Sequence, residues 1–443
     1  DTVSGHAILL SYDSISSTLI EKLDRFGDQY ALLTSDTEEC VRLIDQGINA
    51  FVGDPSIEST YRRLRLEQAA IVALTGSDFE NARLAFTIRA LNPQIPIISA
   101  ADSKSSSEVI RLSGANKAFQ LGNIVGEALA RRAYGGDSLS HVVASFDELL
   151  IVEAIADSPE LVGKTLAEAN LRKSAGVNVI GFWERGEFTI SAPDAVINPN
   201  SVLLLAGSKE TLARFDSKYR NAHNREGHTV VIGAGRVGTA VCETLASNNT
   251  NFKIVDRSPH ALKPFGDKGV IGDASTFETL NMAGIIEART VIITSHDDDL
   301  EVYLTIFCRK LRPDIQIICR ATEVRTISEL HRAGADIVLS YASMGANILF
   351  NFLKHSDILM VAEGLDIFRL KAPESLHGKT LGEMNLRVST GCNVIAIRGE
   401  DGLQAPPRPS IPIKPDDELI LISDTESERL FCELHPPSVS EGS

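Results

Sequence analysis

The stretch His228–Asp256, HTVVIGAGRVGTAVCETLASNNTNFKIVD, decides the fold of this chain. A short apolar run ends at Ile232, the glycines of a G-x-G-x-x-G motif follow, and a second apolar run ends at Asp256. Between the two runs, apolar residues recur at helical spacing. A strand, a glycine turn, a helix and a second strand that ends in an acid together predict a Rossmann-type dinucleotide-binding unit.

Each residue type in this motif has a physical role. Gly233 permits the tight turn after the strand, and Gly235 leaves the backbone bare so that a pyrophosphate can approach it. Gly238 allows the helix to pack closely on the strand, and the N-terminus of the helix offers unpaired N–H groups to the phosphates. Asp256 is placed to accept hydrogen bonds from ribose hydroxyls. We predict a nucleotide site here, and the alternative is a glycine turn kept only for packing.

The composition limits the classes of partner and compartment. At 443 residues the chain is too long for one ordinary core, so we expect more than one domain. A formal net charge of -16 argues against nucleic acid or an anionic membrane surface as a partner, although plain solubility also explains it. The six cysteines form no C-x-x-C pair and are typical of small buried residues in a reducing cytoplasm. No apolar stretch approaches the roughly 18 residues that cross a bilayer.

An internal repeat extends this pattern over the whole chain. GHAILL at Gly5–Leu10 corresponds to GHTVVI at Gly227–Ile232, and GKTLAEANLR from Gly163 corresponds to GKTLGEMNLR from Gly378. Expected strands correspond as well: 70–75 with 290–294, 96–101 with 316–321, and 202–205 with 419–421. A period of about 220 residues indicates a tandem duplication of a two-lobe unit.

We therefore predict an α/β fold with two tandem Rossmann-like lobes, each a parallel sheet followed by a small α+β lobe. The predicted bounds are 1–140 for the first Rossmann lobe, 141–220 for the first C-terminal lobe, 221–355 for the second Rossmann lobe and 356–434 for the second C-terminal lobe. The polar segment 218–227 is expected to link the halves, and residues 435–443 are expected to form a disordered tail.

The first half lacks the chemistry of the second. Ser11, Asp13 and Ser16 stand where the three glycines stand, Thr34 replaces Asp256 and Ala100 replaces Arg320. A carboxylate at position 13 would repel a pyrophosphate, and we expect its Cβ to strain the turn. The first lobe is therefore predicted to keep the fold without the dinucleotide site and to serve as scaffold, interface or site for another ligand.

The ordered set of motifs resembles the RCK (regulator of K⁺ conductance) or KTN family, the cytosolic regulatory domains of potassium channels and of Trk/Ktr potassium transport systems. The resemblance rests on Gly227–Gly238, the strand that ends at Asp256, VIGDAS at Val270–Ser275, VIITSHDDD at Val291–Asp299, IICRA at Ile317–Ala321, AGAD at Ala333–Asp336 and the two GKTL segments. It covers nearly the whole chain.

The resemblance implies an assembly and a function. Met344–Leu353 would form the family's crossover helix, and Rossmann lobes would pack side by side as a homotetramer with a ring of eight RCK domains. The chain would be the gating-ring part of a ligand-gated potassium channel, at the cytoplasmic face of the membrane. The pore would lie upstream in the same polypeptide, because the start at Asp1 resembles a linker and because the first glycine motif is lost. No direct membrane insertion of this part is expected.

Two other functions stay open. One is the peripheral nucleotide-binding subunit of a Trk/Ktr-type transport system, and the other, from a different class, is an NAD-dependent oxidoreductase. An oxidoreductase would need an acid or base that faces the nicotinamide, and the duplicated small lobes are poor in histidine. We therefore expect no enzyme activity and no catalytic residues.

The resemblance also assigns residues to the nucleotide site. They are Gly233, Ala234, Gly235, Arg236, Val237, Gly238, Asp256, Arg257, Asp273, Ala274, Thr294, Ser295 and Arg320. The glycines would lie under the phosphates, Asp256 would hold the adenosine ribose, and Asp273 and Ala274 would lie near the adenine. Thr294 and Ser295 would lie by the phosphates or the second ribose, with the three arginines as candidate phosphate partners.

The ligand is expected to be NAD(H) or an adenine nucleotide, ADP or ATP. Asp256 favours NAD over NADP because a carboxylate repels a 2′-phosphate, whereas Arg257 beside it would tolerate one. A divalent cation such as Ca²⁺ is left open at two acidic groups. One is His296–Asp299 with Glu301, for which a charged loop that caps the next helix is the favoured alternative, and the other comprises Asp13, Asp36 and Asp54.

Overall fold

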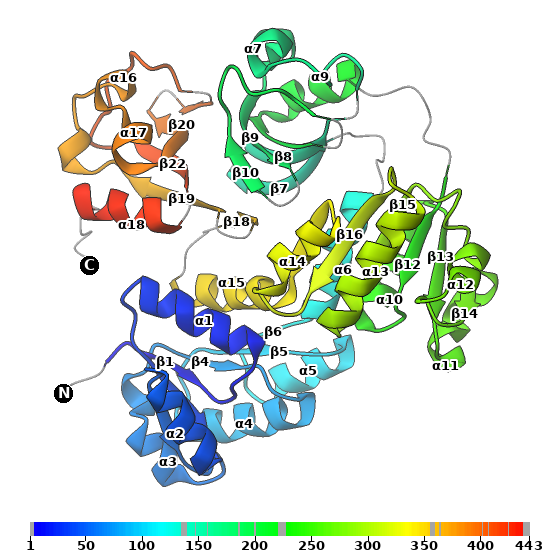
Figure 1. Cartoon of the computed structure of the whole chain (residues 1–443). Helices are drawn as coiled ribbons and strands as arrows, with labels where there is room; N and C mark the ends of the chain where they lie inside the picture. The colour runs from blue at the N-terminus through cyan, green and yellow to red at the C-terminus, as the bar shows by residue number, and fades with distance from the viewer. Residues whose placement is uncertain are drawn as a thin grey trace. The chain divides into compact units, whose positions relative to one another are not determined.

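The computed structural model describes residues 4–133, 140–146, 148–156, 158–184, 187–198, 201–219, 227–354, 359–362, 365–400, 402–405, 407–423 and 425–436. The chain forms two compact units, and each unit combines the equivalent parts of both halves (Figure 1). The first unit contains Asp1–Ala133 with Gly227–Ser356, and the second contains Tyr134–Glu226 with Asp357–Ser443. The predicted linker falls mostly on residues 220–226 and the predicted tail on residues 437–443, which lie outside the described residues.

The first Rossmann lobe holds a six-stranded parallel sheet in the order β3-β2-β1-β4-β5-β6. Its elements are β1 (Ala7–Leu9), α1 (Ser14–Arg25), β2 (Tyr30–Thr34), α2 (Thr37–Asp45), β3 (Ala50–Val52), α3 (Glu58–Arg63), η1 (Leu66–Gln68), β4 (Ile71–Leu74), α4 (Asp78–Leu91), β5 (Ile97–Ala100), α5 (Lys104–Leu112), β6 (Lys117–Phe119) and α6 (Leu121–Ala133).

The second Rossmann lobe repeats this sheet in the order β14-β13-β12-β15-β16-β17. Its elements are β12 (Thr229–Ile232), α10 (Arg236–Ser247), β13 (Phe252–Asp256), α11 (Pro259–Leu262), η2 (Lys263–Lys268), β14 (Gly269–Ile271), α12 (Phe277–Met282), β15 (Thr290–Ile293), α13 (Asp298–Leu311), β16 (Gln316–Ala321), α14 (Thr326–Ala333), β17 (Ile337–Ser340) and α15 (Tyr341–Lys354). The strand order reverses beside β12 and β1, where such sheets bind their ligands at the carboxyl ends of the strands.

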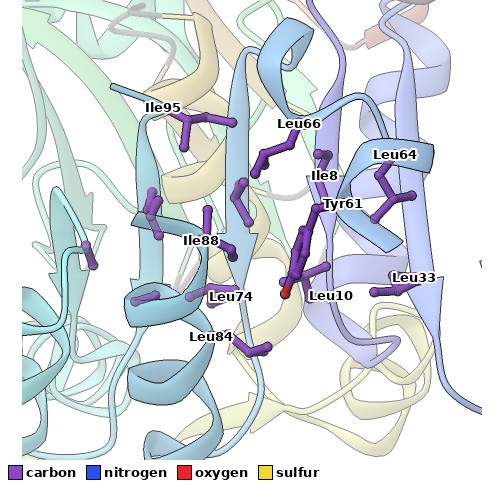
Figure 2. Packing of buried hydrophobic residues seen from close by; sticks show 14 of the residues in the cluster. Ile8, Leu10, Leu33, Tyr61, Leu64, Leu66, Leu74, Leu84, Ile88 and Ile95 are labelled. Atoms are coloured by element: carbon purple, nitrogen blue, oxygen red, sulfur yellow. The ribbon is translucent and has the colours of Figure 1, made fainter. Parts of the chain in front are cut away.

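Each Rossmann lobe has a core of branched aliphatic side chains beneath its helices. In the first lobe, Figure 2 shows Tyr61 lying among Ile8, Leu10 and Leu64, with Ile88 of α4 in the same cluster. The Tyr61 hydroxyl donates a hydrogen bond of 2.7 Å to the carbonyl of Pro55, which satisfies its polar end. The continuous apolar runs read from the sequence are thus buried strands covered on both faces.

The last helix of each Rossmann lobe packs on the other lobe. Helix α6 contacts α10, β15 and β16 of the second lobe, and α15 contacts α1 and β5 of the first (Figure 1). A small residue permits each close approach: a Cβ on Gly126 would lie 2.7 Å from the carbonyl oxygen of Val237, and a Cβ on Gly345 would lie 2.9 Å from Ile15. This exchange explains why the two Rossmann lobes form one compact unit. The predicted crossover helix is present as α15.

The small lobes form the second unit, and each holds a five-stranded antiparallel sheet, in the orders β10-β9-β11-β8-β7 and β18-β19-β22-β20-β21. The first lobe contains β7 (Ser140–Phe146), β8 (Leu149–Ile155), α7 (Leu166–Ala169), α8 (Leu171–Ser174), β9 (Asn178–Glu184), β10 (Glu187–Ile190), β11 (Val202–Gly207) and α9 (Lys209–Tyr219). The second contains β18 (Leu359–Ala362), β19 (Leu365–Lys371), η3 (Glu374–Leu376), α16 (Leu381–Met384), α17 (Leu386–Thr390), β20 (Asn393–Gly399), β21 (Gly402–Gln404), β22 (Glu418–Ser423) and α18 (Thr425–Leu434).

One apolar cluster joins the two small lobes. It contains Ile151 and Leu204 from the first sheet together with Ile395 and Ile420 from the second, all fully buried. The second unit therefore has a core that neither small lobe completes alone. Within the described part of the chain, no helix is both long enough and apolar enough to cross a membrane.

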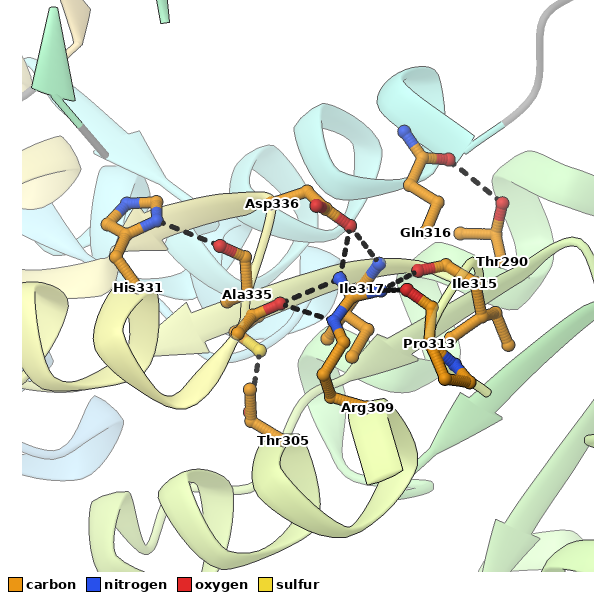
Figure 3. Close-up of polar contacts among 12 residues, drawn as sticks. Thr290, Thr305, Arg309, Pro313, Ile315, Gln316, Ile317, His331, Ala335 and Asp336 are labelled. Atoms are coloured by element: carbon orange, nitrogen blue, oxygen red, sulfur yellow. Dashed lines mark hydrogen bonds and ion pairs between the residues drawn. The ribbon is translucent and has the colours of Figure 1, made fainter. Parts of the chain in front are cut away.

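An arginine clamp fixes one edge of each Rossmann sheet. In the second lobe, Figure 3 shows Arg309 of α13 donating to the carboxylate of Asp336, at 2.8 Å. Arg309 also donates to the carbonyl of Gly334. Asp336 also accepts from the backbone N–H of Ile317 at 2.8 Å. Gly334 has a φ of +116°, which a side chain would disfavour. The clamp therefore ties α13, the end of α14 and the start of β16 together.

Candidate functional site

The glycine turn after β12 has the geometry expected of a phosphate-binding turn. Gly233 has a φ of +101°, in the left-handed region that favours glycine. A Cβ on Gly238 would lie 1.8 Å from the carbonyl oxygen of Gly233, so only glycine allows α10 to begin this close to the strand. A Cβ on Gly235 would meet no protein atom within 4 Å. The space in front of Gly235 is therefore open to a ligand.

The N-terminus of α10 has no side-chain cap. Gly235 occupies the N-cap position and contributes no side-chain hydrogen bond to the first turn. In the first lobe, by contrast, Asp13 caps α1 by accepting from the N–H of Ser16 at 2.8 Å, and the Ser16 hydroxyl accepts from the N–H of Asp13. In the first lobe the Asp13 carboxylate thus occupies the helix N-terminus at which a phosphate would bind. In the second lobe the first turn of α10 keeps backbone N–H groups that can donate to an anion.

The strain predicted at Asp13 is wrong. Its φ of -142° and ψ of -176° are extended values that any residue adopts. Ser11, unlike Gly233, does not have a positive φ. The first lobe has rebuilt its turn around a capping side chain, so the loss of glycine carries no backbone penalty there.

Asp256 ties the second strand to the glycine turn. One carboxylate oxygen accepts from the N–H of Ala234 at 2.7 Å, and the other accepts from the N–H of Ser258 at 2.8 Å. Each oxygen can accept a second hydrogen bond, so the carboxylate retains capacity for ribose hydroxyls. In the first lobe Thr34 takes this position and bonds to Glu39 instead.

Arg257 and Asp273 form an ion pair of 2.6 Å at the ends of neighbouring strands. Asp273 also accepts from the hydroxyl and the backbone N–H of Ser275, and these hydrogen bonds hold the pKa of Asp273 below its ordinary value, with a smaller contribution from Arg257. Asp54 of the first lobe makes the same turn with Ser56. The turn at Asp273 is therefore part of the fold, and the pairing with Arg257 is what the second lobe adds.

The remaining predicted residues have protein partners of their own. The Thr294 hydroxyl lies 3.0 Å from the carbonyl oxygen of Ile232 and 3.1 Å from that of Gly233, so it braces the glycine turn. The Ser295 hydroxyl accepts from the N–H of Asp297 at 3.1 Å. Ala234 and Val237 are buried, and Ala274 packs against the core.

Arg320 is a buried cation at the end of β16, with only 8% of its surface exposed. Its guanidinium carbon lies 4.4 Å from the centroid of the Tyr341 ring, and one nitrogen donates to the carbonyl of Ser295 at 3.3 Å. Burial lowers the pKa of Arg320, and the nearby Glu301, which is fully buried on α13, offsets part of this shift. Burial likewise raises the pKa of Glu301 well above its ordinary value.

Arg236 differs from its predicted surroundings. Its guanidinium forms an ion pair with the carboxylate of Asp102, which follows β5 of the first lobe. The sequence pattern did not predict Asp102 or Tyr341 as neighbours of the site. Asp102 comes near it only through the packing of the two lobes, whereas Tyr341 follows β17, which pairs with β16 beside Arg320. The burial of Glu301 was not predicted, although its spacing from Leu304, Thr305 and Cys308 places it with them on one helical face.

The acids at the start of α13 bond to neighbouring backbone and side-chain groups of the chain. Asp297 accepts from the N–H of Leu300, and Asp298 accepts from the N–H of Thr322 and the hydroxyl of Thr326. In the first lobe Asp36 caps α2 in a similar way. Nowhere in the described ranges do three or more His, Cys, Asp or Glu side chains gather in a way that could hold a metal ion. The helix-cap interpretation holds for Asp297, whereas Asp298 ties the loop after β16 to α13.

Comparisons with known proteins cover nearly the whole chain. The TrkA-N domain matches residues 7–121 and 229–341, and the TrkA-C domain matches residues 149–219 and 367–435. The solved GsuK RCK domain is 34% identical with a TM-score of 0.69, covering 98% of this chain and 95% of that chain. The GsuK channel bound to NAD is 34% identical with a TM-score of 0.68, covering 98% of this chain and 79% of that chain.

Curated relatives match over shorter stretches. Potassium channel protein 1 of Methanocaldococcus jannaschii is 24% identical over 48% of this chain and 66% of its own length, so the match leaves out about a third of that protein. Probable potassium channel protein 2 of the same organism is 28% identical over 51% and 71%. A Trk system potassium uptake protein TrkA homologue of Pyrococcus horikoshii is 27% identical over 40% of this chain and 82% of its own length.

Proposed function

The chain belongs to the RCK family, with two TrkA-N and two TrkA-C domains in alternation, and on this premise we propose that it is the nucleotide-sensing gating-ring part of a ligand-gated potassium channel. The observation that carries the proposal is the match with GsuK over 98% of the chain, because the GsuK channel has been solved with NAD bound. Through differential affinity for two shapes of the ring, the ligand would bias a potassium pore.

The nucleotide binds in the second lobe. Its phosphates lie over Gly235, where the space is open and the first turn of α10 lacks a side-chain cap, and its adenosine ribose bonds to Asp256. NAD(H) is the favoured ligand, with ADP and ATP as alternatives, and Asp256 disfavours a 2′-phosphate. The first lobe binds no nucleotide, because Asp13 already occupies the N-terminus of α1.

A calorimetric titration with NAD, NADH, ADP and ATP, with and without Ca²⁺, tests this site. Gly235→Asp copies the substitution of the first lobe, and the backbone at Gly235 (φ -72°, ψ -172°) accepts any residue. We expect one nucleotide per chain for the wild type and none for Gly235→Asp. The matched control, Asp13→Gly, removes the carboxylate from the first lobe and should leave binding in the second intact. Binding by Gly235→Asp would refute the assignment.

The assembly is a homotetramer that forms a ring of eight RCK domains. Support comes from apolar side chains on α4 and α5, two packed helices of the first lobe: Phe79 is 91% exposed and Leu112 is 88% exposed. Tyr303 and Ile306 are exposed on α13, the counterpart of α4. Large apolar side chains exposed on neighbouring helices are the kind of surface that contacts another copy.

Native mass spectrometry tests the assembly. Phe79→Glu with Leu112→Glu should break the wild-type assembly into smaller species, because charges would be buried in the contact. Val388→Glu, which alters a 78% exposed side chain on α17 in the other unit, is the control and should assemble as the wild type does. A monomeric wild type, or a double variant of unchanged mass, would contradict the ring.

The partner is a potassium pore in the same polypeptide, which would place this part of the protein at the cytoplasmic face of the membrane. The coding sequence upstream tests this point, since a pore helix and a TVGYG-like filter would identify a channel. Their absence would favour a peripheral Trk/Ktr-type subunit, an alternative that the match with the Pyrococcus TrkA homologue supports.

The protein is not an enzyme in this proposal. In the described part of the second lobe, Asp256, Asp273 and Asp298 each hold backbone N–H groups of the surrounding turns, which is a structural use of an acid. Turnover of NADH with a small carbonyl substrate would instead support an oxidoreductase.

A further inference from the structure

A charge pair connects the two Rossmann lobes at the nucleotide site. Arg236, the first residue of α10, forms its ion pair with Asp102 of the first lobe, and the two side chains are 58% and 54% exposed. The pair has no counterpart at the equivalent place in the duplication. Ser14 corresponds to Arg236, and Thr322 corresponds to Asp102. The acid belongs only to the first lobe and the arginine only to the second.

Backbone packing holds both partners in place. A Cβ on Gly122 of α6 would lie 3.3 Å from the Cβ of Arg236, so α6 lies directly against the first turn of α10. The backbone N–H of Asp102 donates to Asp78 at 2.9 Å, which fixes the loop after β5. The packing of α6 on α10 thus positions the backbone that carries Arg236, and the Asp78 bond positions the loop that carries Asp102.

Near this ion pair, arginines of the second lobe and acids of the first lobe also act together on Tyr341. Tyr341 at the start of α15 has a pKa raised mainly by burial, while Arg236 and Arg320 lower it and Asp102 and Asp13 raise it. Two arginines of the second lobe and two acids of the first thus act on one phenol. The acid that caps the degenerate turn and the acid after β5 both belong to the lobe that lacks the G-x-G-x-x-G motif.

Resting on the nucleotide site proposed above, we propose that Asp102 is a positioning residue that competes with the ligand's pyrophosphate for Arg236. A pyrophosphate over Gly235 would lie at the same helix N-terminus from which Arg236 projects, and it would carry two negative charges against one on Asp102. Binding would therefore exchange one anion for another on the same guanidinium. The first lobe, which has lost its own site, would set the affinity of the second.

The exchange also makes the contact between the lobes depend on occupancy. A ligand that breaks the Arg236–Asp102 pair binds less tightly by the free energy of that pair, and binding in turn weakens the contact between the lobes. An ion pair exposed to this degree is weak, so its removal should change the affinity by about two- to fivefold.

A double-mutant cycle on the full chain tests the proposal, with NAD as the probe in calorimetry at low ionic strength. Asp102→Asn should bind NAD about two- to fivefold more tightly than the wild type, and Arg236→Gln should bind it less tightly. In the Arg236→Gln background, Asp102→Asn should have no further effect. Asp102→Glu should return the wild-type affinity, and the gain in Asp102→Asn should disappear at about 1 M salt.

The control is Asp36→Asn, which removes a charge from the same lobe where it caps α2, and it should leave NAD affinity unchanged. If Asp102→Asn increased the affinity for NAD equally in the wild-type and the Arg236→Gln backgrounds, the increase would be a general effect of charge, and the proposal would be overturned. An unchanged or weaker affinity in Asp102→Asn would overturn it as well. A wild type that binds no nucleotide overturns the proposed function and this inference together, whereas normal wild-type binding with an inert Asp102 overturns only the inference.

Discussion

The carboxylate of Asp256 and the backbone of Ala234 share a hydrogen bond of 2.7 Å, which ties the end of β13 to the glycine turn after β12. The acid expected to hold the ribose is therefore also a structural member of the phosphate turn. Because one group serves both purposes, a ligand that bonds to Asp256 acts directly on the turn that carries its phosphates. The first lobe has neither the acid nor the glycines.

Replacing Asp256 should change ligand choice as well as affinity. Asp256→Asn removes the charge and leaves one acceptor oxygen for two backbone N–H donors and the ribose hydroxyls. A hydrogen bond to a charged group contributes about 1.5–3 kcal/mol, so NAD should bind roughly ten- to 150-fold less tightly. NADP should lose less, because the repulsion of its 2′-phosphate is also removed. Calorimetry with both ligands measures the ratio, and an unchanged ratio would contradict the role assigned to Asp256.

Substitutions at the two glycines at the start of α10 should have different effects, one on the stability of the fold and the other on nucleotide binding. Gly238→Ala places a Cβ 1.8 Å from a backbone oxygen, and such overpacking should lower the free energy of unfolding by about 1–3 kcal/mol. Gly235→Ala meets no protein atom and should change stability by less than about 1 kcal/mol. It should nevertheless weaken NAD binding, because its methyl group enters the open space. Thermal unfolding and titration of both variants check this, and equal stabilities would show that the turn is looser than described.

The arginine clamp should be worth more in the second lobe than in the first. Arg309 bonds to Asp336, whereas its counterpart Arg89 bonds to the neutral Asn116. Lysine lacks the planar fork that serves several acceptors at once, so Arg309→Lys should cost on the order of 2 kcal/mol and Arg89→Lys less. Amide hydrogen exchange in β17 should accelerate in Arg309→Lys. Equal losses in both variants would mean that the charge on Asp336 adds nothing.

The parts of the fold that depend on local pattern could be predicted from the sequence. The expected strand 316–321 is β16, residue for residue, since an apolar run between turns is a local property. The glycine turn and the duplication could be predicted for the same reason. The exchange of α6 and α15 between lobes was not, because an apolar helical face does not specify which sheet covers it. For the same reason the sequence could offer Arg236 as a phosphate partner but could not reveal Asp102.

Glu301 should make stability depend on pH. Burial raises the pKa of Glu301 in the folded state, so the folded chain holds this proton more tightly than the unfolded chain does. The tighter proton binding of the folded chain stabilises it fully when the pH is below the pKa that Glu301 has in the unfolded chain. This stabilisation is lost as the pH rises through the pKa that Glu301 has in the folded chain. Glutamine resembles the protonated acid and does not titrate. The free energy of unfolding of Glu301→Gln relative to wild type should therefore increase as the pH rises from about 5, at up to about 1.4 kcal/mol per pH unit.

The first lobe provides the matching experiment, because Asn81 is the buried counterpart of Glu301. Its amide nitrogen donates to the carbonyls of Gly76 and Ala100, so a neutral group already occupies this position in one copy. Asn81→Asp introduces a buried acid without an arginine at position 100, and its stability should fall relative to wild type as the pH rises. Urea unfolding across this pH range measures both variants. Parallel curves for wild type and Glu301→Gln would mean that Glu301 does not titrate differently in the folded and unfolded states, and that Arg320 fully compensates its burial.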